Sequence, residues 1–412
     1  MDRTERQKLC IKRWLAAGGS ATVVASTGFG KTRVGLLAAE LLIRKKSDAQ
    51  ILISVPTEIL KEQWMEELIK RNMFSNCRVV VINTIIKGEW EVDLLIVDEC
   101  HLVASDQFRA IFDQVSYNMV LCLTGTLERL DGKEVIIKQF APVCDNIPMK
   151  EALANGWVSP VKEYVVMLDV DLTEYNKLNQ VFIGYFSQMG FDFETAMSAA
   201  TNSIFRNKLA KKLGIKPKDM AGIAYGWLKA LKGRKAFVQS HPKKFEIARK
   251  ILDARKNKKC ITFSATIKDA EFLNNKEFVL HSKQSKKHNA QILESFNDAD
   301  MGVIHSSKSC DQGVDIRGLS VGIILSTDSS KIRKVQRNGR ICRFEEGKTA
   351  ELFTLVIRGT QEWNWFQNSA TTNYTVINEE QLDQILVGEE IEEKIKMSFD
   401  LGNPTDAVKE EL

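Results

Sequence analysis

One eight-residue stretch constrains the fold more than any other part of the sequence: Ala25-Ser26-Thr27-Gly28-Phe29-Gly30-Lys31-Thr32. An apolar run at residues 21–25 leads into it, and a helix-compatible run at residues 34–42 follows it. A strand, a glycine-containing loop and a helix N-terminus in this order direct backbone N–H groups at one point, where they attract a phosphate chain. Because Ala25 replaces the first glycine of the strict phosphate-loop pattern, an ordinary glycine-rich turn is the alternative at this point.

The side chains at the end of this loop supply what a bound nucleotide needs. Lys31 can reach the terminal phosphates, and the Thr32 hydroxyl can bind Mg²⁺. The sequence therefore predicts a nucleotide and Mg²⁺ at the loop. The predicted nucleotide-binding residues are Ser26, Thr27, Gly28, Phe29, Gly30, Lys31 and Thr32.

Length and composition favour a protein of two or three domains. The chain has 412 residues, of which 44% are hydrophobic, enough for substantial cores. No stretch approaches the roughly 20 apolar residues that span a membrane, and the charged residues 1–8 lead into no apolar signal region. We therefore expect a soluble protein of the cytoplasm, in a bacterium or a phage-infected cell, without a membrane partner. The 8 cysteines are scattered without C-x-x-C spacing, which argues against a zinc site or a disulfide framework.

The charge is distributed unevenly along the chain. The net charge is +5, but residues 379–412 contain 11 acidic and 3 basic residues, whereas residues 206–259 contain 18 basic and 3 acidic ones. A basic body with an acidic tail predicts a polyanionic partner, and we expect nucleic acid to contact the basic segment. The alternative for that segment is a solvated helical surface. The acidic tail either shields this surface or recruits a protein partner.

The pattern of strands and helices predicts a parallel α/β domain at the N-terminus. Continuous apolar strands are expected at residues 21–25, 51–55, 78–82, 93–97 and 119–123, with helices at residues 5–17 and 57–70. Polar clusters follow these strands, and ligands bind at the carboxyl ends of strands in such sheets. We assign residues 1–145 to this domain.

The remainder of the chain divides into three segments. The pattern of residues 146–235 predicts a mostly helical connector or insert, with a β-like run at 161–168 and helices at 173–187 and 194–213. Within it, residues 209–215 either open a helix-turn-helix or simply end a helix at Gly214. Residues 236–368 predict a second parallel-sheet domain, with strands at 260–263, 278–280, 301–305, 321–325 and 350–356. Residues 369–412 form the acidic tail, in which residues 381–395 are spaced as an amphipathic helix.

Two adjacent carboxylates follow the strand at 93–97. Asp98 and Glu99 fit a pair in which one carboxylate holds Mg²⁺ and the other orients or deprotonates an attacking water. Neighbouring residues at a strand end point in different directions, so Asp98 suits the metal and Glu99 the water. An exposed acidic turn is the alternative, and the phosphate loop upstream argues against it.

A site that hydrolyses a phosphate bond also needs positive charge opposite the leaving phosphate. Gln336, Arg340 and Arg343 in the second domain can supply polar and cationic groups, and the two arginines share a face if they lie on a helix. Such groups act only when the two domains close on the nucleotide. Without the other motifs, a basic helix facing solvent or nucleic acid would explain them better.

Taken in order, these motifs resemble those of superfamily 2 helicases of the DExH type, which have two RecA-like domains and use ATP with Mg²⁺. The resemblance covers residues 3–358. The matching motifs are the phosphate loop, Pro56-Thr57, Asp98-Glu99-Cys100-His101, Thr124-Gly125-Thr126, Thr262-Phe263-Ser264, Gly313-Val314-Asp315 and Gln336 to Arg343. The run at residues 123–132 is similar to the subgroup of type III restriction motor subunits, XPB-like helicases and phage branch-migration helicases, which act mainly on double-stranded DNA. The chain length and the lack of a recognisable nuclease motif match a phage-type stand-alone motor.

The resemblance also implies roles for individual residues. Gln7 would read adenine, Gly313 and Asp315 would lie at the nucleotide, and Asp315 would contact the ribose or couple the domains. Thr124 and Thr126 would couple hydrolysis to the grip on nucleic acid. Contacts with the nucleic acid backbone would come from Pro56, Thr57, Thr84 and Ser264. The sequence departs from the family pattern at Gly125, Leu127 and Gln312, which affects coupling more than hydrolysis.

The sequence thus predicts an ATP-dependent DNA helicase or translocase that moves on, or remodels, double-stranded or branched DNA. Two alternatives stay open. The first is an RNA helicase, because motor motifs contact the backbone and do not by themselves distinguish the sugar. The second is an ATP-gated subunit that binds or remodels nucleic acid without processive unwinding.

Overall fold

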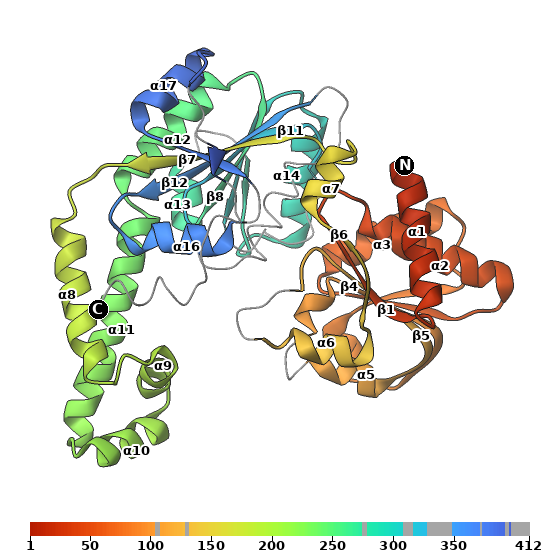
Figure 1. The fold of residues 1–412 in the computed structure, drawn as a ribbon, viewed down its shortest axis with the longest axis horizontal. Helices are drawn as coiled ribbons and strands as arrows, with labels where there is room; N and C mark the ends of the chain where they lie inside the picture. The colour runs from red at the N-terminus through yellow and green to blue at the C-terminus, as the bar shows by residue number, and fades with distance from the viewer. Residues whose placement is uncertain are drawn as a thin grey trace.

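The computed structural model describes residues 1–103, 108–127, 132–273, 278–307, 316–327, 348–370, 373–391 and 395–396. These residues form two lobes, each built on a sheet, and a helical arm that extends from the second lobe (Figure 1). Among the described residues, no helix has the length and apolar character needed to cross a membrane.

The first lobe is a six-stranded parallel sheet with the strand order β3-β2-β4-β5-β1-β6. The central strands are apolar over their buried parts because helices cover both faces of the sheet; β2, for example, is buried at every position. Short 3₁₀ turns occupy Cys100–Leu102 and Phe108–Ala110. The elements are α1 (Arg3–Ala16), β1 (Ser20–Ala25), α2 (Lys31–Lys45), β2 (Ile51–Val55), α3 (Glu58–Lys70), β3 (Cys77–Val81), α4 (Ile82–Ile85), β4 (Trp90–Asp98), α5 (Ile111–Gln114), β5 (Val115–Thr124), α6 (Glu134–Phe140), β6 (Val143–Ile147) and α7 (Met149–Ala154).

The second lobe is an eight-stranded sheet with the order β14-β13-β7-β12-β11-β8-β10-β9. Its strands are parallel except for the antiparallel pair β13–β14. The elements are β7 (Val161–Leu168), α12 (Pro242–Ala254), β8 (Lys259–Ser264), α13 (Ile267–Leu273), β9 (Phe278–Leu280), α14 (Lys286–Asp298), β10 (Gly302–Ser307), β11 (Leu319–Ile324), β12 (Ala350–Ile357), α16 (Gln361–Ser369), β13 (Tyr374–Ile377), α17 (Glu379–Val387) and β14 (Ile395–Lys396).

The arm consists of α8 (Thr173–Ser187), α9 (Phe193–Thr201), α10 (Ser203–Leu213) and α11 (Pro217–Gln239). In Figure 1, α8 and α11 run side by side away from the second lobe, and α9 and α10 lie at the far end. The arm has its own core around Trp227, which is fully buried and packs on Phe182, Phe186 and Phe193. A separate core of this kind lets the arm hold its shape away from either sheet.

The structure differs from the sequence expectations at both ends of the second lobe. The strand at residues 161–168 was expected in the connector, but it pairs with β12 and β13 inside the second sheet. Residues 374–387 were expected in the acidic tail, but they form β13 and α17 of the same lobe. The predicted helix at 381–395 ends at Gly388, which adopts a left-handed conformation.

Two further differences concern single elements. The strand β6 was not expected, because its sequence, Val-Cys-Asp-Asn-Ile, carries polar residues. The expected helix at 194–213 is two helices, because Asn202 leaves the helical conformation and its side chain caps α10. Gly214 ends α10 in a left-handed conformation, and α11 begins at Pro217.

Candidate nucleotide site

The candidate site lies at the carboxyl edge of the first sheet. The strands β4, β5 and β1 are neighbours, so the residues that follow them lie together although they are far apart in sequence. The phosphate loop follows β1, Asp98 ends β4, and Thr124 ends β5. This edge is where parallel sheets bind ligands.

The phosphate loop depends on two glycines in conformations that other residues rarely adopt. Gly28 has φ of 85° and Gly30 has φ of 97°. A Cβ added at Gly30 would also lie 2.7 Å from Nε2 of Gln7, so any side chain there would displace Gln7. Gly30 is the N-cap of α2 and has no side chain that could cap the helix. The N–H groups at the start of this 15-residue helix are therefore not capped by a side chain, as an anion site requires.

The other loop residues are held by the surrounding structure. The Ser26 backbone N–H donates to the Ile147 carbonyl at 2.9 Å, and the Phe29 side chain is fully buried. Gln7 Nε2 donates to the Phe29 carbonyl at 2.8 Å, so the helix α1 contacts the loop directly. The Ser26 hydroxyl is buried and has no hydrogen-bond partner among the described residues. A buried hydroxyl left in this condition is costly unless a ligand pairs with it.

Lys31 and Glu99 face each other across the site. Lys31 Nζ lies 3.6 Å from Glu99 Oε1, and both side chains are mostly buried. Burial by itself would raise the pKa of the Glu99 carboxyl, but the charge of Lys31 and the hydrogen bond with His101 hold that pKa below its ordinary value. Glu99 also has φ of 51°, an uncommon conformation for a residue with a side chain. Such backbone strain concentrates at functional sites.

Asp98 is fixed in place by Trp64. The indole Nε1 of Trp64 donates to Asp98 Oδ2 at 2.9 Å, and the Glu99 backbone N–H donates to Oδ1 at 3.0 Å. Burial and the nearby charge of Glu99 raise the pKa of Asp98, against the opposing effects of Trp64 and Lys31. A cation beside Asp98 would favour its charged form.

Trp64 is a site residue that sequence reasoning missed. It lies on α3 and is fully buried. A Cβ at Gly35 of α2 would lie 2.6 Å from the Trp64 ring, so glycine at that position makes room for it. The signal in the sequence was Gly35, because a glycine inside a helix usually marks a position where another group packs closely.

A chain of polar contacts joins the acidic pair to the end of β5. His101 Nδ1 lies 3.4 Å from Glu99 Oε2 and 3.0 Å from the Thr124 hydroxyl. The Thr124 hydroxyl donates to the Thr126 carbonyl at 2.8 Å, and the Thr126 N–H donates to the Thr124 hydroxyl oxygen at 3.3 Å. The structure therefore brings Glu99, Thr124 and Thr126 into one network.

Several predicted residues lie outside this network. Thr57 caps α3 by accepting from the Leu60 N–H at 3.3 Å, next to half-buried Pro56. Thr84 is exposed on α4, and Ser264 is buried at the end of β8 in the second sheet. The structure gives no direct sign of a nucleic acid contact at any of them. Five predicted residues lie outside the described residues: Gly313, Asp315, Gln336, Arg340 and Arg343.

Three family descriptions match the chain in sequence order. "DEAD/DEAH box helicase" matches residues 4–91, "Type III restriction enzyme, res subunit" matches residues 83–129, and "Helicase conserved C-terminal domain" matches residues 243–345. Together they cover the phosphate loop, the acidic pair and the strands β8 to β11 of the second sheet.

The chain is also similar to curated proteins. It is 26% identical to "DNA 3'-5' translocase XPB2" of Sulfurisphaera tokodaii, over 87% of this chain and 82% of that protein. It is 22% identical to "Putative helicase 22" of Sulfolobus islandicus filamentous virus, over 82% of this chain and 61% of that protein. It is 32% identical to "DNA 3'-5' helicase XPB" of Mycobacterium tuberculosis, over 39% of this chain and 34% of that protein.

Solved structures match the whole fold. The Pyrococcus furiosus Hef helicase domain has a TM-score of 0.53 at 16% identity, covering 89% of this chain and 99% of that one. Saccharomyces cerevisiae Dbp5 bound to RNA and ADP BeF3 has a TM-score of 0.60 at 13% identity, covering 92% of this chain and 91% of that one. At these identities the likeness concerns the fold alone.

Proposed function

The chain belongs to the superfamily 2 helicases, which are nucleic-acid-dependent ATPases, and on that premise we propose that it is an ATP-driven motor on double-stranded or branched DNA. Its two parallel sheets correspond to the RecA-like domains of that family. The observation that carries the proposal is the contact chain from Lys31 through Glu99 and His101 to Thr124. It connects the phosphate loop to the acidic pair and to the coupling motif.

The first lobe fits ATP and its Mg²⁺. The uncapped start of α2 and the unpartnered Ser26 hydroxyl suit a phosphate chain, with Lys31 beside it. Thr32 and Asp98 would hold the metal ion, which neutralises charge developing on the phosphates when it is bound. Glu99 would orient and deprotonate the attacking water. Gln7, Thr27, Gly28 and Gly30 complete the nucleotide-binding set.

The second lobe would complete the site from the opposite side. We assign Gln336, Arg340 and Arg343 to the charge that develops in the transition state, and Gly313 and Asp315 to the nucleotide. Support comes from their place in the sequence, inside the region that matches the helicase C-terminal domain. Closure of the two lobes on ATP would therefore control hydrolysis.

The arm offers the surface for DNA. It carries exposed lysines that form no ion pair within the described residues, and the guanidinium of half-buried Arg206 lies 4.9 Å over the Tyr225 ring. Several basic residues of the second lobe differ, because their side chains are engaged within the protein: Arg255 and Lys258 with Glu351, and Lys244 with Glu362. The exposed arm lysines are Lys208, Lys211, Lys212, Lys216, Lys218, Lys229, Lys232 and Lys235. We therefore place the DNA contact on the arm and not on the whole of residues 206–259.

Replacing Lys208, Lys211, Lys212 and Lys216 with Gln is expected to weaken DNA binding and to make it less dependent on salt. Each lost phosphate contact should lower the slope of log K against log salt by about 0.9 for duplex DNA. The matched control is Lys243→Gln with Lys250→Gln, because these lysines pair with Glu379 and Asp383 of α17. An unchanged slope in the arm variant would remove the reason for placing DNA there.

Thr124→Val is expected to reduce the stimulation of ATP hydrolysis by nucleic acid. The variant keeps the shape of the side chain but loses the bonds to His101 and Thr126, at a cost of about 1 kcal/mol, or roughly fivefold in rate. Thr22→Val is the matched control, because its buried hydroxyl donates to the Ala141 carbonyl away from the site. Equal stimulation in the two variants would contradict a coupling role for Thr124.

A motor and a nucleotide-gated clamp differ in what they do to DNA. We expect the protein to displace a third strand from a triplex, or to separate a fork, only with ATP and only when Lys31 is intact. Tight ATP-dependent binding without either activity would favour the clamp. An RNA helicase is the other candidate, and one relative is named "Putative ATP-dependent RNA helicase MJ1505", 22% identical over 84% of this chain.

A further inference from the structure

The phosphate loop touches the segment that leads from the first sheet to the second. Phe29, between Gly28 and Gly30, packs its buried ring against Trp157 with the centroids 5.5 Å apart and the planes at 60°. Trp157 follows α7, close before β7 opens the second sheet. The two residues are 128 positions apart in the sequence. The contact therefore joins a predicted nucleotide-binding loop to the connection between the lobes.

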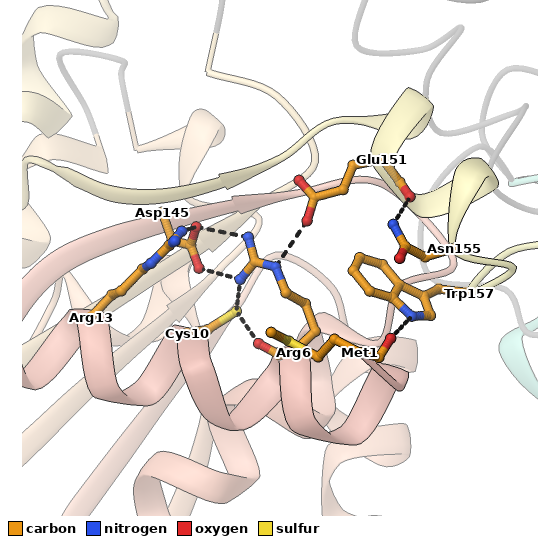
Figure 2. A network of polar contacts seen from close by, with 8 residues as sticks. All are labelled: Met1, Arg6, Cys10, Arg13, Asp145, Glu151, Asn155 and Trp157. Carbon is orange, nitrogen blue, oxygen red and sulfur yellow. Dashed lines mark hydrogen bonds and ion pairs between the residues drawn. The ribbon is translucent and has the colours of Figure 1, made fainter.

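Trp157 is held from several sides. Its N–H donates to the Ala152 carbonyl at 2.9 Å, and its indole Nε1 donates to the Met1 carbonyl at 3.3 Å (Figure 2). Arg3 Nη1 donates to the Trp157 carbonyl at 3.3 Å. The side chain is 4% exposed. A ring fixed in this way cannot follow a movement of Phe29 without moving its own backbone.

An ion-pair network joins α1, β6 and α7, the elements around Trp157. Figure 2 shows Arg6 of α1 at its centre, with bonds to Asp145 at 2.6 and 2.9 Å and to Glu151 at 2.9 Å. Arg13 pairs with the same Asp145. Because Arg6 and Asp145 are buried and paired with each other, and Glu151 pairs with Arg6, they hold the three elements as one unit.

This unit meets the phosphate loop at three points. Gln7 of α1 donates to the Phe29 carbonyl, the Ile147 carbonyl of β6 accepts from the Ser26 N–H, and Trp157 packs on the Phe29 ring. On its other side, Val161 packs against the cores of both lobes. Only three residues, 158–160, thus separate the ring that touches the loop from a side chain that touches the second lobe.

We propose that Trp157 is a positioning residue that transmits the state of the phosphate loop to the second lobe. The proposal rests on the proposed function, since it takes the loop to bind ATP. When the loop changes on binding nucleotide, Phe29 displaces Trp157, and residues 158–161 carry that displacement to β7. Trp157 touches neither the phosphates nor the reacting atoms in this account.

Tryptophan fluorescence of the full chain tests whether Trp157 senses nucleotide. A non-hydrolysable ATP analogue with Mg²⁺ is expected to change the emission of the wild type, and Trp157→Phe should lose most of that change, with the remainder coming from Trp64 beside Asp98. Trp90→Phe is the matched control, because the Trp90 indole likewise donates to a backbone carbonyl, that of Ile85 at 3.1 Å, but lies on β4 far from the loop. The control should keep the change. A change in Trp157→Phe as large as that of the wild type would overturn the proposal.

A second variant tests transmission. Trp157→Leu keeps an apolar side chain but loses the ring contact and the indole bond, and its nucleic-acid stimulation of kcat should fall on the order of tenfold to a hundredfold, while the Kd for nucleotide changes far less. In Trp90→Leu, nucleic acid should stimulate kcat as much as it does in the wild type. Equal stimulation in the two variants would overturn the proposal. Wild-type protein that binds no nucleotide would instead overturn the proposed function, and this inference with it.

Discussion

Glu99→Gln is expected to bind ATP about as well as the wild type and to hydrolyse it at least ~100-fold more slowly. The amide keeps the size of the side chain and can still accept from His101, so the site keeps its shape. It cannot take a proton from water, and it removes the negative charge that faces Lys31 at 3.6 Å. Binding is measured with a fluorescent nucleotide, and hydrolysis by phosphate release at saturating DNA.

The control for that variant lies on the same strand. Glu91→Gln changes an exposed carboxylate at the opposite end of β4 and should hydrolyse ATP as the wild type does. Turnover by Glu99→Gln at the wild-type rate would refute the assignment of Glu99 to the attacking water. Loss of nucleotide binding would show that Glu99 also holds the phosphate loop, through Lys31, in addition to positioning the water.

Lys244→Met is expected to lower the free energy of unfolding by about 3–5 kcal/mol. Lys244 and Glu362 are both fully buried and lie 2.6 Å apart, and Lys244 Nζ also donates to the Leu325 carbonyl at 2.7 Å. Glu362 accepts in addition from Thr327 and from the Ile357 N–H. Without Lys244, the carboxylate would stay buried without its cation. Urea denaturation of the full chain measures the loss.

Two further variants separate the charge from the packing. Lys243→Met, at the neighbouring position, removes a partly exposed lysine and should cost less than about 1 kcal/mol. Lys244→Met with Glu362→Gln removes both charges and keeps an acceptor for one of the two donors, Thr327 or Ile357, so it should recover part of the stability. If the double variant is as unstable as Lys244→Met alone, the buried charge is not the cause of the loss.

The helicase motifs of the first lobe were predictable because they depend on local order. A strand, a loop with two glycines and a helix place Lys31 without reference to the rest of the chain. The same holds for Asp98 and Glu99 at the end of an apolar strand. The parallel α/β pattern predicts that both segments lie at the same edge of the sheet, and they do, but their strands are not adjacent, because β5 lies between β4 and β1.

Contacts between distant elements were not predictable in this way. Trp64 bonds to Asp98 from α3, and Trp157 meets Phe29 from beyond α7; neither residue belongs to a motif. The strand β6 was missed because Asp145 looks unsuited to a buried strand. The burial of Asp145 is explained only by its ion pairs with Arg6 and Arg13, which lie more than a hundred residues earlier in the sequence.

Composition is a poor guide to structure where charges are paired. Residues 379–387 are acidic enough to suggest a solvated tail, yet they form α17, whose Glu379 and Asp383 pair with lysines of α12. The basic segment was likewise treated as one surface, although several of its cations are bound within the second lobe. Only the fold distinguishes a paired charge from a free one.

The most direct test of the account is the rate of ATP hydrolysis with each polymer in turn. Single-stranded DNA, duplex DNA, forked DNA and RNA are compared at equal nucleotide concentration and at one salt concentration, since binding depends steeply on salt. We predict that duplex or forked DNA stimulates hydrolysis most and that Lys31→Ala abolishes it with every polymer. Stimulation by RNA alone, or by no polymer, would contradict a motor that acts on double-stranded or branched DNA.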